Sequence, residues 1–481
     1  MAAYSSLLRH ATLVLLPLPG LYTVLLIGAF DWLAYCAALS WVLFIYLVWR
    51  CEQGFFAVAI GMLLGQFAAT VSNAHIESGG YILEQFTFGY PTGSTVRLVM
   101  YNALFFVSAL WTYNLVKHLF PINASRPSGF SRAERLIRLA IYVSAGLLFA
   151  VLLFALFAFG SPLLQELSRF EYFDNYPLIK SLAAKLPILA FACGIVAAHY
   201  RGRHALATRY MLAGIILMNI LTGDKFSGII LAIFMYLMPI MVVQAQRRVT
   251  SLFTFGRITL ASVVMVFLLM LIIYHYSRTY GFDASAAAQF VFDRMFGLQG
   301  HVWWGIDQIN LRKQQIVGTD LSTLFVPSGD VRDSGVNVLM YAVSPASLVT
   351  SYISSGVRFT SGNPAIGLYT LGSLGLLFYQ LLTGILFGLL SYYLVRHISL
   401  RQIARALIMA MIYIILLDPL AMGEWYIVFT SYFLKYVVLI VLISFFVALK
   451  LRGPYGLKPL DLAQATIQSR LPVAGSNVNV R

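Results

Sequence analysis

Long apolar runs separated by short polar connections extend over almost the whole chain. An apolar run of about 20 residues is long enough to cross a bilayer as an α-helix. Such runs lie near residues 11–30, 32–49, 54–73, 96–117, 136–159, 182–199, 206–222, 226–244, 258–275, 365–395, 402–419 and 426–449. The pattern predicts an all-α, polytopic integral membrane protein with about 12 transmembrane helices, forming a single membrane domain over residues 1–481.

The composition favours the same class of protein. Hydrophobic residues make up 60% of the 481 residues and charged residues only 11%, whereas soluble chains contain about 25% charged residues. A soluble fold of this length has too small an interior to bury so many apolar side chains. A bilayer removes this difficulty because lipid covers the apolar surface.

The connections between the runs fall into two alternating sets by charge. The basic set contains Arg50, Lys117, Arg126, Arg132, Arg135, Arg138, Arg201, Arg203, Arg209, Arg247, Arg248, Arg257, Arg396, Arg401, Arg405 and the tail from Lys450. The mixed or acidic set comprises the stretches around Glu77 and Glu84, residues 166–174 and residues 418–424. Because cytoplasmic loops carry an excess of Lys and Arg, the alternation predicts that both termini are cytoplasmic.

The longest connection, residues 276–364, joins the ninth and tenth predicted helices and falls on the outer side. Its aromatic content argues against disorder, since disordered segments are poor in aromatic residues. Residues 286–298 have helical spacing, which predicts a short interfacial helix within the loop.

Two features concern how the predicted helices pack. The run 365–395 is long enough to tilt or to break. Glycines four residues apart occur at Gly61/Gly65 and Gly384/Gly388, and this spacing lets helices approach closely. We interpret both steps as ordinary helix packing.

Several catalytic motifs are missing from the chain. It has no Gly-rich nucleotide loop, HExxH, paired CxxC or GxSxG, so an enzyme of this sequence is expected to use no nucleotide, no zinc or other metal and no cofactor. Nothing in the sequence indicates nucleic-acid binding. The three cysteines, Cys36, Cys51 and Cys193, suggest no disulfide framework.

Cations expected at the outer membrane boundary are the main candidates for chemistry. Arg278 and Arg358 bracket the long loop, and Lys225 follows Asp224 in a hairpin between two predicted helices. Guanidinium groups bind phosphate or pyrophosphate oxygens in bidentate fashion. The alternatives are structural: an Arg that snorkels to lipid headgroups, and a polar hairpin tip that needs glycine conformations.

Three further cations are weaker candidates for binding an anion. Arg294 and Arg332 each neighbour an aspartate, Asp293 or Asp333, with which they can pair. Lys435 lies inside the twelfth predicted helix, where an unpaired charge costs about 2.5–3.5 kcal/mol. It is expected to face the bundle interior, as an anion ligand or in an ion pair.

The segment 300–307 combines an imidazole, two indoles and a carboxylate. Trp303 and Trp304 suit stacking on sugar faces, or a place at the membrane interface. His301 and Asp307 are candidate general bases for a sugar hydroxyl, although a lone loop histidine is commonly structural. The competing carboxylates are Asp224, Asp330 and Glu424.

Three segments resemble the bacterial oligosaccharide repeat-unit polymerases, the O-antigen polymerase (Wzy) family. They are LTGDKFSG at 221–228, GHVWWGIDQ at 300–308 and RFTSGNPAIGL at 358–368. The layout, with a large periplasmic loop in the C-terminal half, is also similar to that family.

The resemblance implies a metal-independent glycosyltransferase of the bacterial inner membrane, with its active site facing the periplasm. It would transfer a growing glycan from undecaprenyl pyrophosphate to a sugar hydroxyl of the next lipid-linked repeat unit. Arg side chains would stabilise the pyrophosphate leaving group, and a carboxylate or His would activate the acceptor hydroxyl. Implied partners are the lipid-linked oligosaccharide, membrane lipid and, as an open question, a polysaccharide chain-length regulator.

Two other functions stay open at this point. An O-antigen ligase uses the same donor with a lipid A-core acceptor. A lipid-linked glycan flippase or other secondary transporter also fits about 12 helices with both termini inside. Against the major-facilitator layout, the long connection lies between helices nine and ten and outside, and residues 49–54 lack the expected Gly/Asp/Arg pattern.

Overall fold

The fold was analysed in a computed structural model that describes most of the chain. The described residues are 31–122, 132–162, 169–223, 227–246, single positions and short stretches between 259 and 278, 281–313, 322–325, 335–354, 358–359 and 362–451. Within these residues the chain is helical, apart from turns and one antiparallel hairpin of β1 (Tyr81–Ile82) and β2 (Thr87–Phe88). The all-α class expected from the sequence is therefore confirmed for the described part.

Nine helices in the described part are long and apolar enough to cross a membrane. They are α3 (Asp31–Cys51), α4 (Gln53–Glu77), α5 (Ser94–Leu119), α6 (Arg132–Phe159), α8 with α9 (Pro177–Ala183 and Leu186–His199), α10 (Arg203–Leu221), α11 (Ser227–Gln246), α18 (Ala365–Ser399) and α19 (Ile403–Met422). In α20 (Ser431–Leu451), the part whose side chains are described, Ser431–Phe445, is apolar and is shorter than these nine spans. This is the architecture of a multi-pass membrane protein. The run at 11–30 and half of the positions in 258–275 lie outside the described residues, so the total of twelve stays a prediction.

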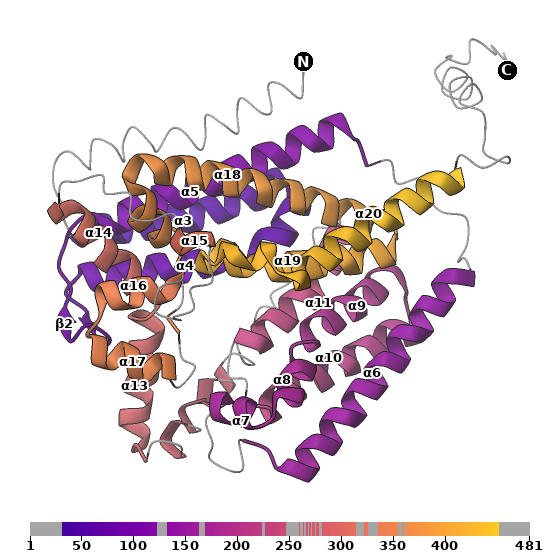
Figure 1. The fold of residues 1–481 in the computed structure, drawn as a ribbon, viewed down its shortest axis with the longest axis horizontal. Coiled ribbons are helices and arrows are strands. Elements are labelled where there is room, and N and C mark those ends of the chain that lie inside the picture. Colours follow the sequence, from indigo (N-terminus) through magenta and orange to yellow (C-terminus); the bar gives the residue numbers. More distant parts are fainter. Residues whose placement is uncertain are drawn as a thin grey trace, which may run out of the picture.

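The helices form one bundle (Figure 1) in which α18 packs along α5 and α11 packs along α9. The contact between α18 and α5 is close because Gly384 and Gly388 face it. A Cβ at Gly384 would lie 2.3 Å from the Phe105 carbonyl oxygen, and a Cβ at Gly388 would lie 2.3 Å from that of Ala109. The expectation that this glycine step serves helix packing is confirmed.

Two of the long apolar runs are interrupted. Helix α18 contains non-helical backbone at Gly372, where φ is 69°, a value that glycine adopts without steric cost. The run at 177–199 is divided between Ala183 and Leu186, just before Pro187 at the start of α9. Of the two possibilities that the sequence left open for the 365–395 run, tilting or breaking, the structure shows a break at Gly372.

The described parts of the predicted long loop form five helices. They are α13 (Ala284–Phe296), α14 (His301–Lys313), α15 (Ser322–Phe325), α16 (Val336–Val343) and α17 (Ala346–Ser354). Together with the β1–β2 hairpin they gather at one end of the bundle (Figure 1), and we call this group the cap. Helix α13 confirms the helix predicted at 286–298, while its place at a membrane interface stays a prediction.

Members of the two charge sets that belong to the described residues lie at opposite ends of the bundle. Away from the cap, the His199 imidazole lies 3.0 Å from the Ile398 carbonyl oxygen, and Arg138 stacks over the Tyr200 ring at 4.7 Å. Arg50 and Lys117 line one pocket at this same end, which we call the far end. Glu77 and Glu84, by contrast, are buried near the cap. This separation agrees with the alternation of charge along the sequence.

Candidate functional site

An ion pair between Arg358 and Glu424 lies at the cap end of the bundle. Arg358 Nη1 is 2.7 Å from Glu424 Oε1, and the Arg side chain is 46% exposed while the Glu side chain is 6% exposed. Arg358 lies in the connection between α17 and α18. The pair therefore joins a buried carboxylate to a cation that still faces the outside.

Local backbone geometry fixes the position of Glu424. The preceding Gly423 ends α19 in the left-handed conformation, with φ of 77°, which favours glycine. A Cβ at Gly423 would lie 2.3 Å from Ile366 Cγ2, and one at Gly335 would lie 2.6 Å from Glu424 Cγ. Glu424 is thus held between the start of α18 and the start of α16, and then η2 (Trp425–Phe429) begins.

Two more acidic or phenolic groups surround this pair. The Tyr426 hydroxyl donates to Glu424 Oε2 over 3.5 Å, and burial together with the Glu424 charge raises the pKa of Tyr426. Asp418, near the end of α19, interacts electrostatically with both Glu424 and Arg358. We call Arg358, Glu424, Asp418 and Tyr426 the open cluster. It places one cation against two carboxyl groups at the boundary of the apolar helices.

A second Arg–carboxylate pair lies under the cap. Arg97 Nη2 and Nε lie 2.5 Å and 2.9 Å from the two Asp307 oxygens, with side chains 18% and 2% exposed. Arg97 also donates to the Thr92 carbonyl oxygen over 2.9 Å. Burial raises the pKa of Asp307, and Arg97 opposes that rise. Both Asp307 oxygens are occupied, which argues against the predicted role as a general base in this conformation.

Glu77 supports the same region by capping helix α5. Its Oε1 accepts from the Thr92 backbone, the Thr92 hydroxyl and the Ser94 backbone at 2.8–2.9 Å, and its Oε2 accepts from the Thr95 backbone at 2.9 Å. A carboxylate satisfies the free N–H groups at a helix start and interacts favourably with the helix dipole. Arg97, Asp307 and Glu77 together form what we call the closed network.

The other predicted groups of α14 also face inward. His301, Trp303 and Trp304 are 0%, 2% and 4% exposed. Trp303 donates to the Ser94 carbonyl oxygen over 2.9 Å, and the Trp304 ring lies 5.1 Å from that of Tyr90. The two indoles are therefore buried in this conformation, and their predicted role in sugar stacking or at the membrane interface stays a prediction. The physical reason for the burial is that α14 packs against α4, α5 and α18 and turns its indoles into that contact.

Lys435 also differs from the expectation. It is exposed at the start of α20, not turned into the bundle, and its ammonium lies 4.2 Å from the Tyr432 ring centroid and 5.0 Å from that of Tyr436. Because α20 begins at Ser431 rather than near residue 426, Lys435 lies within about a turn of the helix start. A lysine so close to the helix end can extend its ammonium group to the membrane–water boundary, so it does not require an acidic partner.

The remaining predicted cations are only partly described. Arg278 lies 5.7 Å from the Tyr274 ring centroid. Arg294 belongs to α13, and its side chain is not described. Asp224, Lys225, Arg332 and Asp330 lie outside the described residues, so their roles stay predictions.

An apolar pocket of about 250 Å³ lies between α4, α11 and α19. It is lined by Ala57, Val58, Ile60, Gly61, Met62, Gly65, Gln66, Ile230, Leu231, Phe234, Met235, Met238, Tyr413, Leu417 and Ala421. A Cβ at Gly65 would meet open space, so this glycine widens the pocket. Of these residues, Leu417 directly precedes Asp418 on α19, while the members of the open cluster themselves are not part of the lining.

Comparison with known proteins identifies one family match. Residues 330–437 match a family of unknown function (DUF6418). No curated protein and no solved structure matches the chain. The matched segment contains Arg358, Asp418, Glu424 and Tyr426, and it excludes the closed network. In the described part of the chain, no three His, Cys, Asp or Glu residues are grouped as a metal site requires.

Proposed function

We propose that this protein is a polymerase of lipid-linked oligosaccharide repeat units. In this proposal it acts from the cap end, on the periplasmic side of a bacterial inner membrane. The observation that carries the proposal is the half-exposed Arg358 paired with the buried Glu424 at the end of the membrane-spanning helices. The resemblance in the sequence and the segregation of cations at the far end support the same orientation.

The open cluster supplies the two groups that such a transfer requires. The Arg358 guanidinium would shift toward the donor pyrophosphate and stabilise its charge as the bond to the anomeric carbon breaks. Glu424, released from its partner, would accept the proton of the acceptor hydroxyl as that oxygen forms the new glycosidic bond. The products are the extended glycan on the acceptor lipid and the polyprenyl pyrophosphate.

The apolar pocket fits the lipid part of this substrate. Its walls are almost entirely apolar, and one lining residue, Leu417, is the neighbour of Asp418 along α19. A polyprenyl carrier is an amphiphile whose apolar tail lies in the membrane and whose anionic head lies at the boundary. The apolar pocket would receive the tail, and the open cluster, which shares helix α19 with the pocket, would receive the head.

The direct test is deletion of the gene in its host, followed by gel analysis of the surface polysaccharide. Complementation would use the wild type, Arg358→Gln, Glu424→Gln and, as a matched control, Arg312→Gln. Arg312 is an exposed cation of the cap that donates to the Tyr90 hydroxyl over 2.7 Å, away from the open cluster. We expect the deletion to leave core carrying a single repeat unit, and the control to restore long chains.

Each of the other possible results indicates a different function. Bare core together with accumulated lipid-linked polymer identifies a ligase. Loss of repeat-unit translocation, with no repeat unit on the outer side, identifies a flippase. Unchanged polysaccharide in the deletion strain would reject a role in glycan assembly and favour a secondary transporter of another substrate.

A further inference from the structure

Two lysines from distant parts of the chain meet at one aromatic ring toward the cap end of the bundle. Lys435 Nζ, near the start of α20, lies 4.2 Å from the Tyr432 ring centroid. Lys185 Nζ lies 5.6 Å from the same centroid, and Lys185 directly precedes α9. Because both distances end at one point, the two ammonium nitrogens are within about 10 Å of each other. We call Lys185 and Lys435 the lysine pair.

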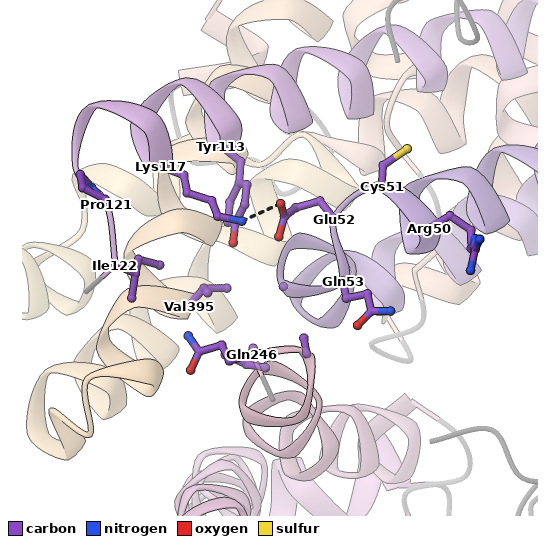
Figure 2. Close-up of a pocket in the computed structure, with 13 residues that line it drawn as sticks. Arg50, Cys51, Glu52, Gln53, Tyr113, Lys117, Pro121, Ile122, Gln246 and Val395 are labelled. Carbon is purple, nitrogen blue, oxygen red and sulfur yellow. Dashed lines mark hydrogen bonds and ion pairs between the residues drawn. The ribbon is translucent and has the colours of Figure 1, made fainter. Parts of the chain in front are cut away.

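The lysine pair carries positive charge that no described carboxylate balances. The two other lysines whose side chains are described both have an acidic partner. Lys180 pairs with Asp174 at 3.6 Å. Lys117, which lines a pocket of about 680 Å³ at the far end, pairs with Glu52 at 2.7 Å (Figure 2). Neither member of the lysine pair forms an ion pair with any residue that the structure describes.

This convergence of two cations favours the binding of an anion between them. Snorkelling toward lipid headgroups and contact with the Tyr432 ring explain either lysine alone. Like charges repel, however, and the flexible four-carbon stems would let the two ammonium groups separate. A phosphate or pyrophosphate offers several oxygens, each of which accepts from an ammonium at about 2.8 Å, so one such group can bridge the lysine pair.

An apolar strip on α20 continues from Lys435 into the membrane. Val438, Leu439 and Leu442 are 55%, 41% and 45% exposed. Spacings of three, four and seven residues place them on the same face of the helix as Lys435. Figure 1 shows that α20 runs away from the cap, so these side chains lie deeper in the membrane than the lysine. A cationic position followed by exposed apolar side chains matches the order of the parts in an anionic lipid.

We propose that the lysine pair binds the pyrophosphate of the acceptor, the lipid-linked repeat unit that receives the growing glycan. This inference rests on the proposed function, because that reaction brings two polyprenyl pyrophosphates to the same side of the membrane. In that proposal the donor pyrophosphate lies at Arg358, so the acceptor needs cations of its own.

The separation between the lysine pair and the open cluster suits this role. The reacting hydroxyl of the acceptor and its pyrophosphate lie at different positions along the repeat unit, with sugars between them. Glu424 and Lys435 are joined by η2 and the first residues of α20, a path of roughly 20 Å at the rise of these helices. One acceptor can therefore contact Glu424 with its hydroxyl and Lys435 with its pyrophosphate.

The test counts bound lipids by native mass spectrometry of the intact protein in detergent with polyprenyl pyrophosphate. We expect two molecules on the wild type and one on Arg358→Gln. In the Arg358→Gln background, Lys185→Gln together with Lys435→Gln should weaken the remaining binding about tenfold or more. Lys435→Arg, which keeps the charge, should retain it. The matched control in the same background is Lys180→Gln, which removes a lysine already paired with Asp174 and should leave binding unchanged.

Elongation in proteoliposomes separates this inference from the proposed function. Loss of the lysine pair should raise the KM for the acceptor and leave kcat nearly unchanged. If the wild type elongates glycans and the double lysine variant keeps the same acceptor KM, the inference is wrong and the proposed function stands. If the wild type elongates nothing while binding still depends on the lysine pair, the proposed function is wrong and the acceptor assignment is overturned with it.

Competition identifies the chemistry that the lysine pair recognises. Polyprenol or phosphatidylglycerol that binds Arg358→Gln as tightly as polyprenyl pyrophosphate does would overturn the inference. Unchanged binding after loss of the lysine pair, or no lipid bound to folded Arg358→Gln, would overturn it as well. Displacement by an equal concentration of inorganic pyrophosphate would overturn the lipid source.

Discussion

The closed network and the open cluster both contain an Arg–carboxylate pair at the cap end, yet their surroundings differ. Arg97 and Asp307 are joined by two hydrogen bonds, and their side chains are 18% and 2% exposed. Arg358 and Glu424 share one hydrogen bond, and the Arg side chain is 46% exposed. The same two chemical groups are thus fully engaged in one place and partly available in the other.

This difference separates a structural role from a functional one. Asp307 has both oxygens occupied, and Arg97 also bonds the Thr92 carbonyl oxygen, so neither group can bind substrate without breaking the fold locally. Arg358 can exchange its single bond to Glu424 for bonds to an anion at the surface. We therefore interpret the closed network as stabilising the fold, and we propose that the open cluster carries the chemistry.

The largest effect is expected from Arg97→Gln. It leaves Asp307 buried without its cation, and breaking a buried ion pair in this way costs about 3–5 kcal/mol. The free energy of unfolding in detergent, measured by denaturant titration, should fall by that amount. The double variant Arg97→Met with Asp307→Leu should recover most of the loss. If Arg97→Gln is as stable as the wild type but has lost activity, the closed network has a functional role and the contrast with the open cluster is wrong.

Arg358→Gln is expected to act mainly on activity. Removing a group that stabilises transition-state charge typically costs a factor of about 10²–10³ in rate, whereas a half-exposed ion pair contributes only about 0.2–1 kcal/mol to stability. Polymer yield should therefore collapse, while the melting temperature falls less than it does for Arg97→Gln. The double variant Arg358→Gln with Glu424→Gln removes any uncompensated carboxylate and should remain inactive. Restored activity in this double variant would contradict the assignment.

Glu77→Gln tests the closed network without touching either ion pair. The substitution keeps the side-chain shape but replaces one oxygen, which accepts backbone N–H groups, by an amide that cannot accept. We expect a loss of about 1–3 kcal/mol in the free energy of unfolding. Activity per folded molecule, measured beside the unfolding titration, should stay at the wild-type level. A selective loss of activity would instead show that Glu77 has a role in function rather than in stability alone.

The smallest expected effect is the response of the two ion pairs to salt concentration. At about 1 M salt the Debye length shrinks to about 3 Å, which screens exposed pairs more than buried ones. A double-mutant cycle in 0.1 M and 1 M salt should show the Arg358–Glu424 coupling falling by a few tenths of a kcal/mol. The Arg97–Asp307 coupling should change less. Equal salt sensitivity would show that the pairs are equally accessible.

The sequence predicts the helices well because membrane spans depend on local composition. Ten of the predicted apolar runs correspond to described helices, counting α20, and the break in the 365–395 run appears at Gly372. The β1–β2 hairpin was not predicted, because its two-residue strands carry too little pattern to detect. Hydropathy also does not show which face of a helix the cap will cover.

The site was less predictable because it depends on contacts between distant segments. Arg358 and Glu424 are 66 positions apart and Arg97 and Asp307 are 210 apart. Glu424 was one of several competing carboxylates in the sequence, and Arg97 was missed inside an apolar run. An Arg one residue into a predicted span is a usable signal, since such a charge needs a partner. Its partner, however, is set by tertiary packing.

The most direct test of the central claim is the elongation rate of purified protein in proteoliposomes supplied with lipid-linked repeat units. Wild type, Glu424→Gln and Arg312→Gln would be compared at equal folded amounts. The account predicts a loss of about 10²–10⁴ in rate for Glu424→Gln, as for removal of a general base, and wild-type elongation for Arg312→Gln. Wild-type elongation by Glu424→Gln would contradict the assignment of chemistry to the open cluster.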